Sequence, residues 1–310
     1  MRRLLTLVIL CAAFLPHAFC QDASVNTIAA AGYLYPAPVM VAPGQVITVF
    51  VEGNLQGDIT ATVRQVSDHP APVLGVTPAP NCIIAPSTPC SSTTAVTIQI
   101  PYEIAPTCFV CATPASFYTQ LFISVNGAAG ALFDLTPLTD RVHILTACDT
   151  LAPNGSGLAP YNGLPCPPLV THADGSLVSA GSPAKGGEVV VAYAVGLGAT
   201  TPAVRTGQAA ATATPASQTF SLDFNFRPNA LATQPMPPMF EPGVLPTSLY
   251  TPLYSGLTPG FVGLYQVNFI VPTPPSGVEP CSGTIQSNLT VSVGGQYSFD
   301  GAGICVAPPE

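Results

Sequence analysis

Charged side chains and tryptophan are what this sequence lacks most. Lys and Arg number 7 and Asp and Glu number 15 among 310 residues, so charge makes up 7% of the chain, and Trp is absent. An average soluble protein carries roughly a quarter charged residues. Hydrophobic residues still make up 48%, which excludes the disordered class with low hydrophobicity and high net charge. The sequence can therefore build real cores, but its surfaces must be polar and nearly uncharged.

Residues 1–20 have the pattern of a secretory signal peptide. A basic start, an apolar run and small residues before the cleavage point follow in order (Arg2 and Arg3, Leu4 to Leu15, Ala18 and Cys20). We predict cleavage before Gln21 and export to the periplasm, the cell surface or the medium. Lipid attachment at Cys20 is the alternative, but Phe19 is bulky where such signals need a small residue. We expect no transmembrane segment in the mature chain, because a spanning helix needs ~20 apolar residues and no run after residue 20 is that long.

Basic side chains are few and scattered after residue 20. Five basic residues stand against 15 acidic ones, a formal charge of −10, and they do not cluster (Arg64, Arg141, Lys185, Arg205 and Arg227). Nucleic acids and anionic membrane surfaces are both bound through basic patches. We therefore exclude both as partners.

Proline and glycine, at 36 and 27 residues, separate short runs of β-branched and aromatic residues. This pattern predicts many short strands joined by turns, and so an all-β protein. Three of the runs recur in the same order in the two halves of the chain: 43–53 with 186–196, 95–101 with 265–272, and 120–127 with 288–295. We expect two tandem immunoglobulin-like β-sandwich domains with disulfide-clipped loops. Their expected bounds are 21–148 and 169–310, with a linker over 149–168 and an insertion near 202–250.

Eight cysteines remain after residue 20, an even number that predicts disulfides in an exported protein. Their spacing favours four local pairs, although spacing does not fix connectivity: Cys82 with Cys90, Cys108 with Cys111, Cys148 with Cys166, and Cys281 with Cys305. Two alternatives are a redox site at Cys108 and Cys111 and a zinc site formed by the first four of these cysteines. Prolines bracket Cys108 and Cys111 where a redox site needs a helix N-terminus. Only one of the two pairs is as tight as a structural zinc site requires.

Several stretches resemble a known family of secreted proteins. They are Pro43-Gly44 before an apolar strand, Asp174-Gly175-Ser176 followed by Pro183-Ala184, the strand end Val195-Gly-Leu-Gly198, and the run from Gly256 to Asn268. Together they look like the Solibacter-type uncharacterised C-terminal domain of acidobacterial proteins. The resemblance implies export and an immunoglobulin-like β architecture, usually appended to larger surface proteins. It implies no known reaction, and therefore no catalytic residue and no cofactor.

The chain departs from that family in three places. Val96 to Pro101 stands where the first half usually carries a Gln-Ile-Asn strand followed by a proline. The eight cysteines and the segment around Met236 also look like local additions.

Motifs of common catalytic sites are missing. The stretch Asn154-Gly-Ser-Gly157 lacks the leading glycine of a nucleophile elbow, and neither a phosphate-binding loop nor a His-Glu-x-x-His motif is present. We therefore expect a protein that is not an enzyme and binds no metal or cofactor. Of the histidines His69, His143 and His172, the last two lie on segments that could pair as strands. A shared metal is one interpretation, and two solvent-facing side chains are the favoured one.

Asp174-Gly175 predicts a hairpin with a type I′ turn, which needs positive φ at both central residues. A calcium site with Asp149 and Asn154 is disfavoured because the regular acid spacing of a calcium loop is missing. Asn154 and Asn288 match the N-glycosylation pattern, which we attribute to chance.

The expected insertion contains a run of prolines and large apolar residues (Met236, Met239, Phe240 and Leu245). Proline prevents ordinary sheet pairing there. The run is either a protein-binding loop or, as we favour, a lid that covers an open sheet edge.

Three classes of function fit these observations. The first is a non-catalytic module of the cell envelope or exterior, a monomer that serves protein–protein interaction, adhesion or assembly with an unknown envelope or extracellular protein as partner. The second is a carbohydrate-binding module, which would use a loose group of tyrosines (Tyr33, Tyr35, Tyr250 and Tyr254). The third is a secreted hydrolase with an unrecognised site. We favour the first, because the absence of tryptophan weakens the second and the missing motifs argue against the third.

Overall fold

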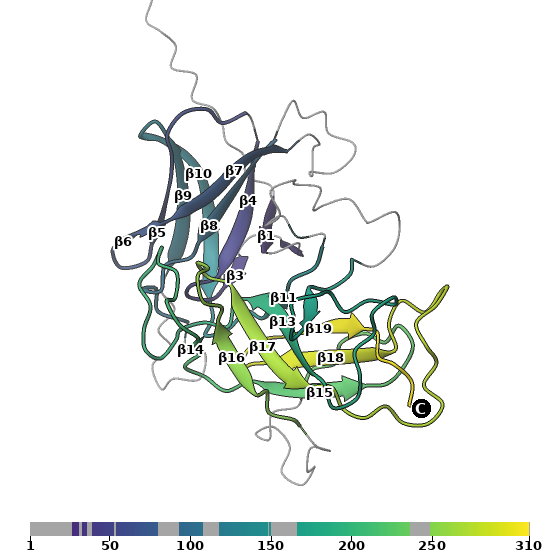
Figure 1. Cartoon of the computed structure of the whole chain (residues 1–310). Helices are drawn as coiled ribbons and strands as arrows, with labels where there is room; N and C mark the ends of the chain where they lie inside the picture. The colour runs from purple at the N-terminus through teal and green to yellow at the C-terminus, as the bar shows by residue number, and fades with distance from the viewer. Residues whose placement is uncertain are drawn as a thin grey trace, which may run out of the picture.

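The computed structural model of the chain describes residues 27–30, 33–35, 39–52, 54–79, 93–107, 118–147, 149, 166–235 and 249–309. All regular structure in these residues is β-strand, so the predicted all-β class is confirmed (Figure 1). None of the described segments forms a helix of the length and apolar character that a membrane span requires.

The N-terminal half, residues 27–138, contains two five-stranded sheets (Figure 1). The first has the order β2-β1-β4-β8-β7, all antiparallel: β2 (Tyr33–Tyr35), β1 (Thr27–Ala30), β4 (Val46–Glu52), β8 (Thr93–Gln99) and β7 (Val73–Ala79). The second has the order β3-β10-β9-β5-β6, in which only the β3–β10 pair is parallel: β3 (Val39–Val41), β10 (Ala128–Pro137), β9 (Thr119–Val125), β5 (Ile59–Arg64) and β6 (Asp68–Ala71). Side chains from both sheets, such as Ile47, Ile98, Leu121 and Ile123, form one buried core.

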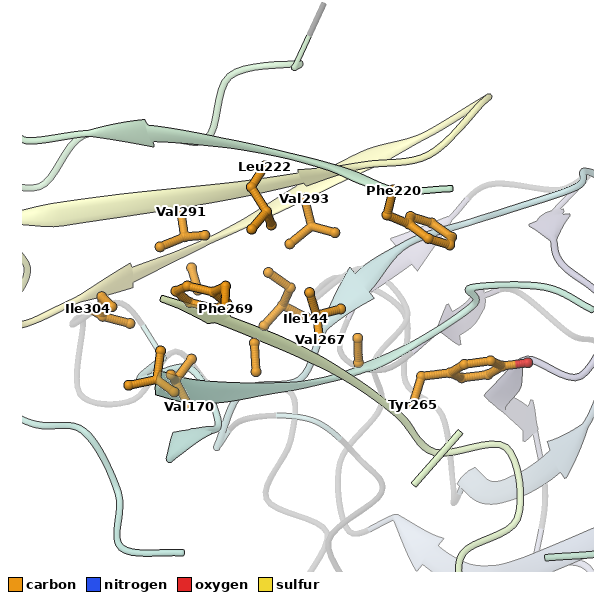
Figure 2. Close-up of a cluster of buried hydrophobic side chains, with 14 of the residues drawn as sticks. Ile144, Val170, Phe220, Leu222, Tyr265, Val267, Phe269, Val291, Val293 and Ile304 are labelled. Atoms are coloured by element: carbon orange, nitrogen blue, oxygen red, sulfur yellow. The ribbon is translucent and has the colours of Figure 1, made fainter. Parts of the chain in front are cut away.

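The C-terminal half, residues 139–309, also contains two sheets. The larger has the order β11-β13-β17-β16-β14, with β12 also paired to β13: β11 (His143–Ile144), β12 (Val170–His172), β13 (Val189–Val195), β17 (Tyr265–Ile270), β16 (Tyr254–Leu257) and β14 (Thr214–Pro215). The smaller has the order β15-β18-β19: β15 (Ser221–Asn225), β18 (Leu289–Gly294) and β19 (Phe299–Ile304). Figure 2 shows Val267 and Phe269 of the larger sheet facing Leu222, Val291 and Val293 of the smaller one.

The runs that were matched between the two halves of the sequence lie on strands that pair in the same way. The first run lies on β4 and β13, the second on β8 and β17, and the third on β9 and β18. β4 pairs with β8, and β13 pairs with β17, both antiparallel. In each half the strand that carries the third run, β9 or β18, belongs to the sheet that does not contain the other two.

The chain passes into the C-terminal half before residue 148, where the first domain was expected to end. β11 pairs with β13, and Val142 and Ile144 pack in the C-terminal core. Within the expected linker, the structure describes only Asp149 and residues 166–168.

A disulfide joins Cys281 and Cys305, one of the pairs that the spacing favours, across 24 residues. Cys166 is disulfide-bonded as well. Its expected partner Cys148 lies outside the described residues.

Several predictions concern residues that the structure does not describe. These are the signal peptide (residues 1–20, with Cys20), four further cysteines (Cys82, Cys90, Cys108 and Cys111), and the apolar insertion residues (Met236, Met239, Phe240 and Leu245).

The hairpin at Asp174 lies where it was predicted, but its turn type is not the predicted one. Gly175 has a φ of 85°, whereas Asp174 is not among the non-glycine residues with positive φ. The Gly175 amide donates to the carbonyl of His172 at 3.0 Å, and the His172 amide donates to the carbonyl of Ser176 at 2.9 Å. This is the three-residue hairpin in which a type I turn is followed by a left-handed glycine. The type I′ prediction was wrong because the loop is one residue longer.

Candidate functional site

A short stretch that enters the C-terminal half concentrates buried ionisable groups in a protein that has few charges. We call residues 139–147 the crossing segment. Asp140 and His143 lie on it and Asp149 follows it, and all three are buried. Burying ionisable groups is costly unless each is paired and hydrogen-bonded. The partners of these side chains therefore decide what the segment does.

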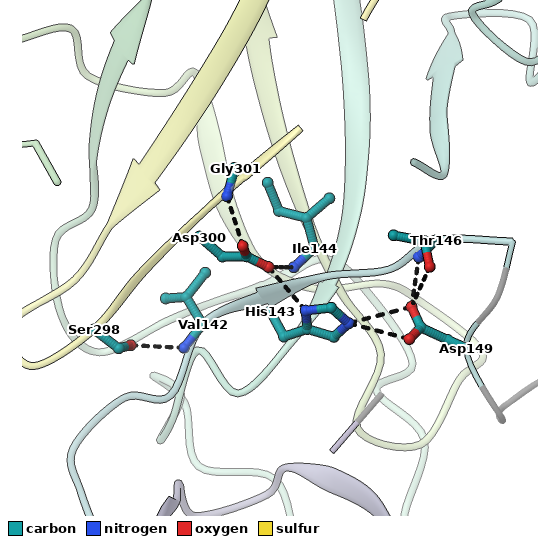
Figure 3. A network of polar contacts seen from close by, with 8 residues as sticks. All are labelled: Val142, His143, Ile144, Thr146, Asp149, Ser298, Asp300 and Gly301. Carbon is teal, nitrogen blue, oxygen red and sulfur yellow. Dashed lines mark hydrogen bonds and ion pairs between the residues drawn. The ribbon is translucent and has the colours of Figure 1, made fainter. Parts of the chain in front are cut away.

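His143 lies between two carboxylates (Figure 3). Its Nδ1 is 2.8 Å from Oδ2 of Asp300 on β19, and its Nε2 is 3.2 Å from both carboxylate oxygens of Asp149. The side chain is 4% exposed. Because an ionised carboxylate can only accept hydrogen bonds, both ring nitrogens donate and the ring is an imidazolium.

The pKa of His143 is raised above its ordinary value of 6.5. Burial acts to lower this pKa, but the hydrogen bonds to Asp149 and Asp300 and the charges of these carboxylates outweigh burial. The raised pKa agrees with the imidazolium that the geometry requires.

Both carboxylates have further partners. Asp300 accepts the amide hydrogens of Ile144 at 2.9 Å and Gly301 at 2.8 Å. Asp149 accepts the amide of Thr146 at 2.5 Å and its hydroxyl at 3.2 Å. A ring that is buried and bonded at both nitrogens cannot exchange protons with a substrate, so the network is a structural clamp between β11 and β19 (Figure 3).

Asp140 ties the same segment to the turn between β18 and β19. Its fully buried carboxylate accepts amide hydrogens from Gln296 at 2.8 Å, Tyr297 at 3.0 Å and Ser298 at 2.9 Å, and the Ser298 hydroxyl at 2.7 Å. The Ser298 hydroxyl oxygen in turn accepts the amide of Val142 at 2.7 Å. The crossing segment is thus held to the β18–β19 hairpin at two places.

The Val195-Gly-Leu-Gly198 motif lies directly against the crossing segment. A Cβ at Gly196 would lie 1.9 Å from the carbonyl oxygen of Arg141, and one at Gly198 would lie 2.2 Å from that of Thr139. Both glycines have positive φ. Only glycine fits at these two positions, because the crossing backbone occupies the space of a side chain.

A second set of contacts joins the two halves directly, and we call it the junction. The hydroxyls of Tyr102 and Tyr265 are 3.1 Å apart, and the Tyr265 hydroxyl donates to the carbonyl of Gly198. The Tyr102 amide donates to the Thr206 hydroxyl at 2.9 Å, and the Gly207 amide donates to Gln99 Oε1 at 2.7 Å. Beside these bonds, three buried apolar side chains from both halves pack together (Val46, Leu145 and Val195).

His172 lies in a second cluster of charged and polar side chains. Its Nδ1 is 2.5 Å from Glu188 Oε1, and its Nε2 is 3.2 Å from the Ser182 hydroxyl oxygen. A serine, a histidine and a carboxylate in this order are the parts of a nucleophilic triad. However, the same Nε2 is 3.1 Å from the backbone carbonyl of Ser182, which can only accept a hydrogen bond.

His172 is therefore protonated at both nitrogens and has no lone pair to take a proton from Ser182. The pKa of His172 is raised chiefly by the hydrogen bond to Glu188, and the bond to the Ser182 carbonyl raises it further. Glu188 also accepts the amide of Lys185 at 2.9 Å. The cluster ties the Asp174 hairpin to the turn before β13.

His143 and His172 do not share a site. Both strands pair with β13, but His143 lies opposite Val195 and His172 opposite Val190. The prediction of solvent-facing side chains was wrong for His143, because its two carboxylate partners allow the ring to be buried. The His172 side chain is also mostly buried, at 13% exposed. Within the described ranges, no group of three or more His, Cys, Asp or Glu residues could hold a metal ion.

The remaining predicted residues have local roles. His69 lies on edge strand β6 with Nε2 3.0 Å from the Ser67 hydroxyl, and Asp174 accepts the amide and hydroxyl of Ser176. Asn288 is buried and donates to two backbone carbonyls, so its glycosylation pattern is a coincidence of sequence. Asn154 lies outside the described residues.

Two of the tyrosines that the alternative of a carbohydrate-binding module would use contact neighbouring residues. Tyr250 packs edge-on against Phe224 with ring centroids 4.9 Å apart, and the Tyr254 hydroxyl donates to the carbonyl of Leu257. The side chains of Tyr33 and Tyr35 are not described.

Sequence reasoning missed Asp140, Asp149 and Asp300 as a set. Asp300 is 157 residues from His143, and no local pattern links the two. The rarity of acids was a usable signal. In a chain with 15 acidic residues, an acid within an apolar run is expected to be buried and hydrogen-bonded to a partner. A scan against protein-family models finds no match for this chain, and a search of curated proteins finds none.

Proposed function

We propose that the protein is a non-catalytic exported module of two tandem immunoglobulin-like sandwiches, held as one rigid unit, that serves adhesion or assembly at the cell exterior. The strand order of the N-terminal half supports this fold. β4, β8 and β7 are neighbours in one sheet, while β5, β9 and β10 are neighbours in the other, with β3 parallel to β10. This strand order agrees with that of an immunoglobulin-like sandwich and supports the proposal.

The C-terminal half has a similar order with shorter edges. β13, β17 and β16 are neighbours in one sheet, and β15, β18 and β19 form the other. A parallel bridge between Ala184 and Val306 follows β19, in the place that the β3–β10 pair takes in the first half.

The observation that carries the proposal is the double attachment of the two halves. Domains joined by a linker move relative to one another unless their interface is extensive. Here the crossing segment follows β10 of the N-terminal half almost directly, pairs with β13, and is bonded to β19 and to the turn before it. The junction adds hydrogen bonds and buried apolar contacts between the halves. A rigid pair presents its outer surfaces at a fixed spacing, which suits adhesion or assembly.

Export is supported by the cysteines. The Cys281–Cys305 disulfide and the bonded state of Cys166 favour an oxidising compartment. The signal-peptide pattern and the resemblance to the Solibacter-type domain point the same way.

Binding to isolated cell envelopes, measured with the purified protein alongside a panel of ester, peptide and glycoside substrates, tests the proposal. We expect saturable binding and no turnover. Turnover of any substrate in the panel that a single substitution abolishes would contradict the proposal.

A secreted hydrolase is the second candidate, and the contact of Ser182 with His172 and Glu188 is the observation that favours it. If His172 could act as a base, a fluorophosphonate probe would label Ser182, and Ser182→Ala would abolish labelling. We expect no labelling, because both nitrogens of His172 carry protons.

A further inference from the structure

The sheet β3-β10-β9-β5-β6 turns one face to the N-terminal core and the other to solvent. On β9, Leu121 and Ile123 are buried in the core, while Gln120 and Phe122 alternate with them and point outward. Side chains on one face of paired strands lie side by side in rows across the sheet. The rows of the outer face can therefore be read from the strand register.

The middle row is polar and crosses four strands. In order across the sheet it consists of Asp134, Gln120, Arg64 and Asp68. Gln120 Nε2 donates to Asp134 Oδ1 at 2.9 Å, and the Arg64 guanidinium donates to both carboxylate oxygens of Asp68 at 2.6 and 2.9 Å. The row offers hydrogen-bond donors and acceptors that neighbouring side chains already hold in place.

Apolar groups flank this row on both sides. On one side Phe122 lies opposite Leu132, and the Arg64 guanidinium lies 4.7 Å from the centre of the Phe122 ring. On the other side is Tyr118, which is 70% exposed. Gln120 Nε2 also donates to the Tyr118 hydroxyl, at 2.5 Å. The tyrosine ring is thus open to solvent but fixed at its hydroxyl end.

We propose that this face binds neutral carbohydrate, with Tyr118 stacked on a sugar ring and the Asp134-Gln120-Arg64-Asp68 row bonded to its hydroxyls. The proposal rests on the proposed function of an exported adhesion module and names the ligand class. A sugar ring has an apolar C–H face and an edge of hydroxyls that both donate and accept. It therefore needs an exposed aromatic ring beside mixed donors and acceptors.

The charge of this face favours a neutral sugar over nucleic acids, acidic glycans and proteins as the ligand. Asp68 neutralises Arg64, which leaves Asp134 and a protein with a net negative charge. Nucleic acids and acidic glycans are repelled by such a surface. The charged row runs through the middle of the face, whereas protein–protein interfaces are depleted of charge at their centre.

Affinity electrophoresis in native gels that contain soluble neutral polysaccharides tests the proposal. The probes are a xyloglucan, a galactomannan, a hydroxyethyl cellulose and an amylopectin, with a sulfated polysaccharide as the charged control. We expect at least one neutral polymer to retard the protein, and the sulfated one not to. Tyr118→Ala should lower the association constant at least about tenfold, as loss of a tyrosine that makes a main contact does at other binding sites.

Two further variants separate binding from folding. Tyr118→Phe keeps the ring and should lose less affinity than Tyr118→Ala. Phe261→Ala removes an aromatic ring that is 56% exposed in the C-terminal half, and it should leave binding unchanged. All variants should keep the wild-type unfolding midpoint, since both rings are exposed.

Three results would overturn the proposal: no retardation by any neutral polymer, equal retardation of wild type and Tyr118→Ala, or self-association that Tyr118→Ala abolishes. Each of these would leave the non-catalytic module in place, provided that envelope binding persists without turnover. Turnover of a polysaccharide would instead contradict the proposed function.

Discussion

At the scale of single residues, the structure depends on a few buried charged side chains that are ion-paired or hydrogen-bonded. His143 binds two carboxylates, and Asp140 accepts four hydrogen bonds from one turn. Removing one partner of a buried ion pair leaves an uncompensated charge and is far more destabilising than removing an exposed pair. Because the sequence has few charged residues, the effect of substituting each of these groups can be measured separately.

Replacing His143 with Ala should lower the free energy of unfolding by about 3 kcal/mol or more, because the buried Asp149 and the partly buried Asp300 then lose the imidazolium that lies between them. Chemical denaturation at pH 6 measures the loss. Asp68→Asn is the matched control: it breaks the exposed pair with Arg64 and should leave stability unchanged. Equal losses in the two variants would contradict the clamp.

Stability should also depend on pH through His143. Its pKa is raised in the folded protein, so the proton is bound more tightly there than in the unfolded chain. The resulting stability is fully present below the ordinary pKa of 6.5 and is lost as pH rises through the raised value. His172 adds a dependence of the same sign.

The difference in unfolding free energy between wild type and His143→Gln, measured from pH 5.5 to pH 9, isolates the His143 contribution. We expect this difference to shrink toward alkaline pH. A difference that stays constant or grows over that range would show that His143 is not the titrating group.

At the scale of elements, β13 connects most of the C-terminal half. It pairs with β11, β12 and β17. Two glycines with positive φ lie just before and just after the strand, Gly187 and Gly196. The two positions differ in their surroundings. A Cβ at Gly187 would meet nothing within 4 Å, whereas one at Gly196 would collide with the crossing segment.

Gly196→Ala should therefore destabilise the protein far more than Gly187→Ala. The second variant bears only the backbone strain of a left-handed alanine, about 1 kcal/mol. The first adds displacement of the Arg141 carbonyl, for a total of at least about 3 kcal/mol. Thermal unfolding of the two variants measures the difference, and similar midpoints would contradict the close approach.

Sequence alone predicted the all-β class and the strands of the three repeated runs, but little of the candidate site. Alternation of apolar and polar residues located strands such as β9 and β17, and in the structure each turns one face to a core. The turn at Asp174 was placed correctly but given the wrong type, since one extra loop residue leaves no local trace. The partners of His143 could not be predicted, because Asp300 reaches it only through the pairing of β18 with β19 and the packing of β11 beside it.

The outer face of the β3-β10-β9-β5-β6 sheet could not be predicted from the sequence for a different reason. Its rows depend on the register between β10, β9, β5 and β6, which the sequence does not specify. Asp68 and Arg64 were visible as neighbours in sequence, but Gln120 and Asp134 join them only across the sheet.

At the scale of the whole molecule, two cores are coupled by the crossing segment and by the junction, and covalent bonds restrict the C-terminal half further. The Cys281–Cys305 bridge closes a loop of 24 residues. In the chain-entropy account, closing such a loop stabilises a protein by about 3 kcal/mol. Replacing both cysteines with serine should cause a loss of that size in chemical denaturation. An unchanged midpoint would contradict the account of the bridge.

The rigidity of the two halves is the central claim, and a distance measurement between them tests it most directly. Val66 and Leu231 are 80% and 86% exposed and lie in different halves. Spin labels on encoded non-cysteine residues at these positions, read by double electron–electron resonance, report the spread of distances without disturbing the disulfides. We predict one narrow distribution for the wild type and a broader one when Asp140→Ala and Tyr102→Phe are combined. A broad or multiple distribution in the wild type would contradict the claim.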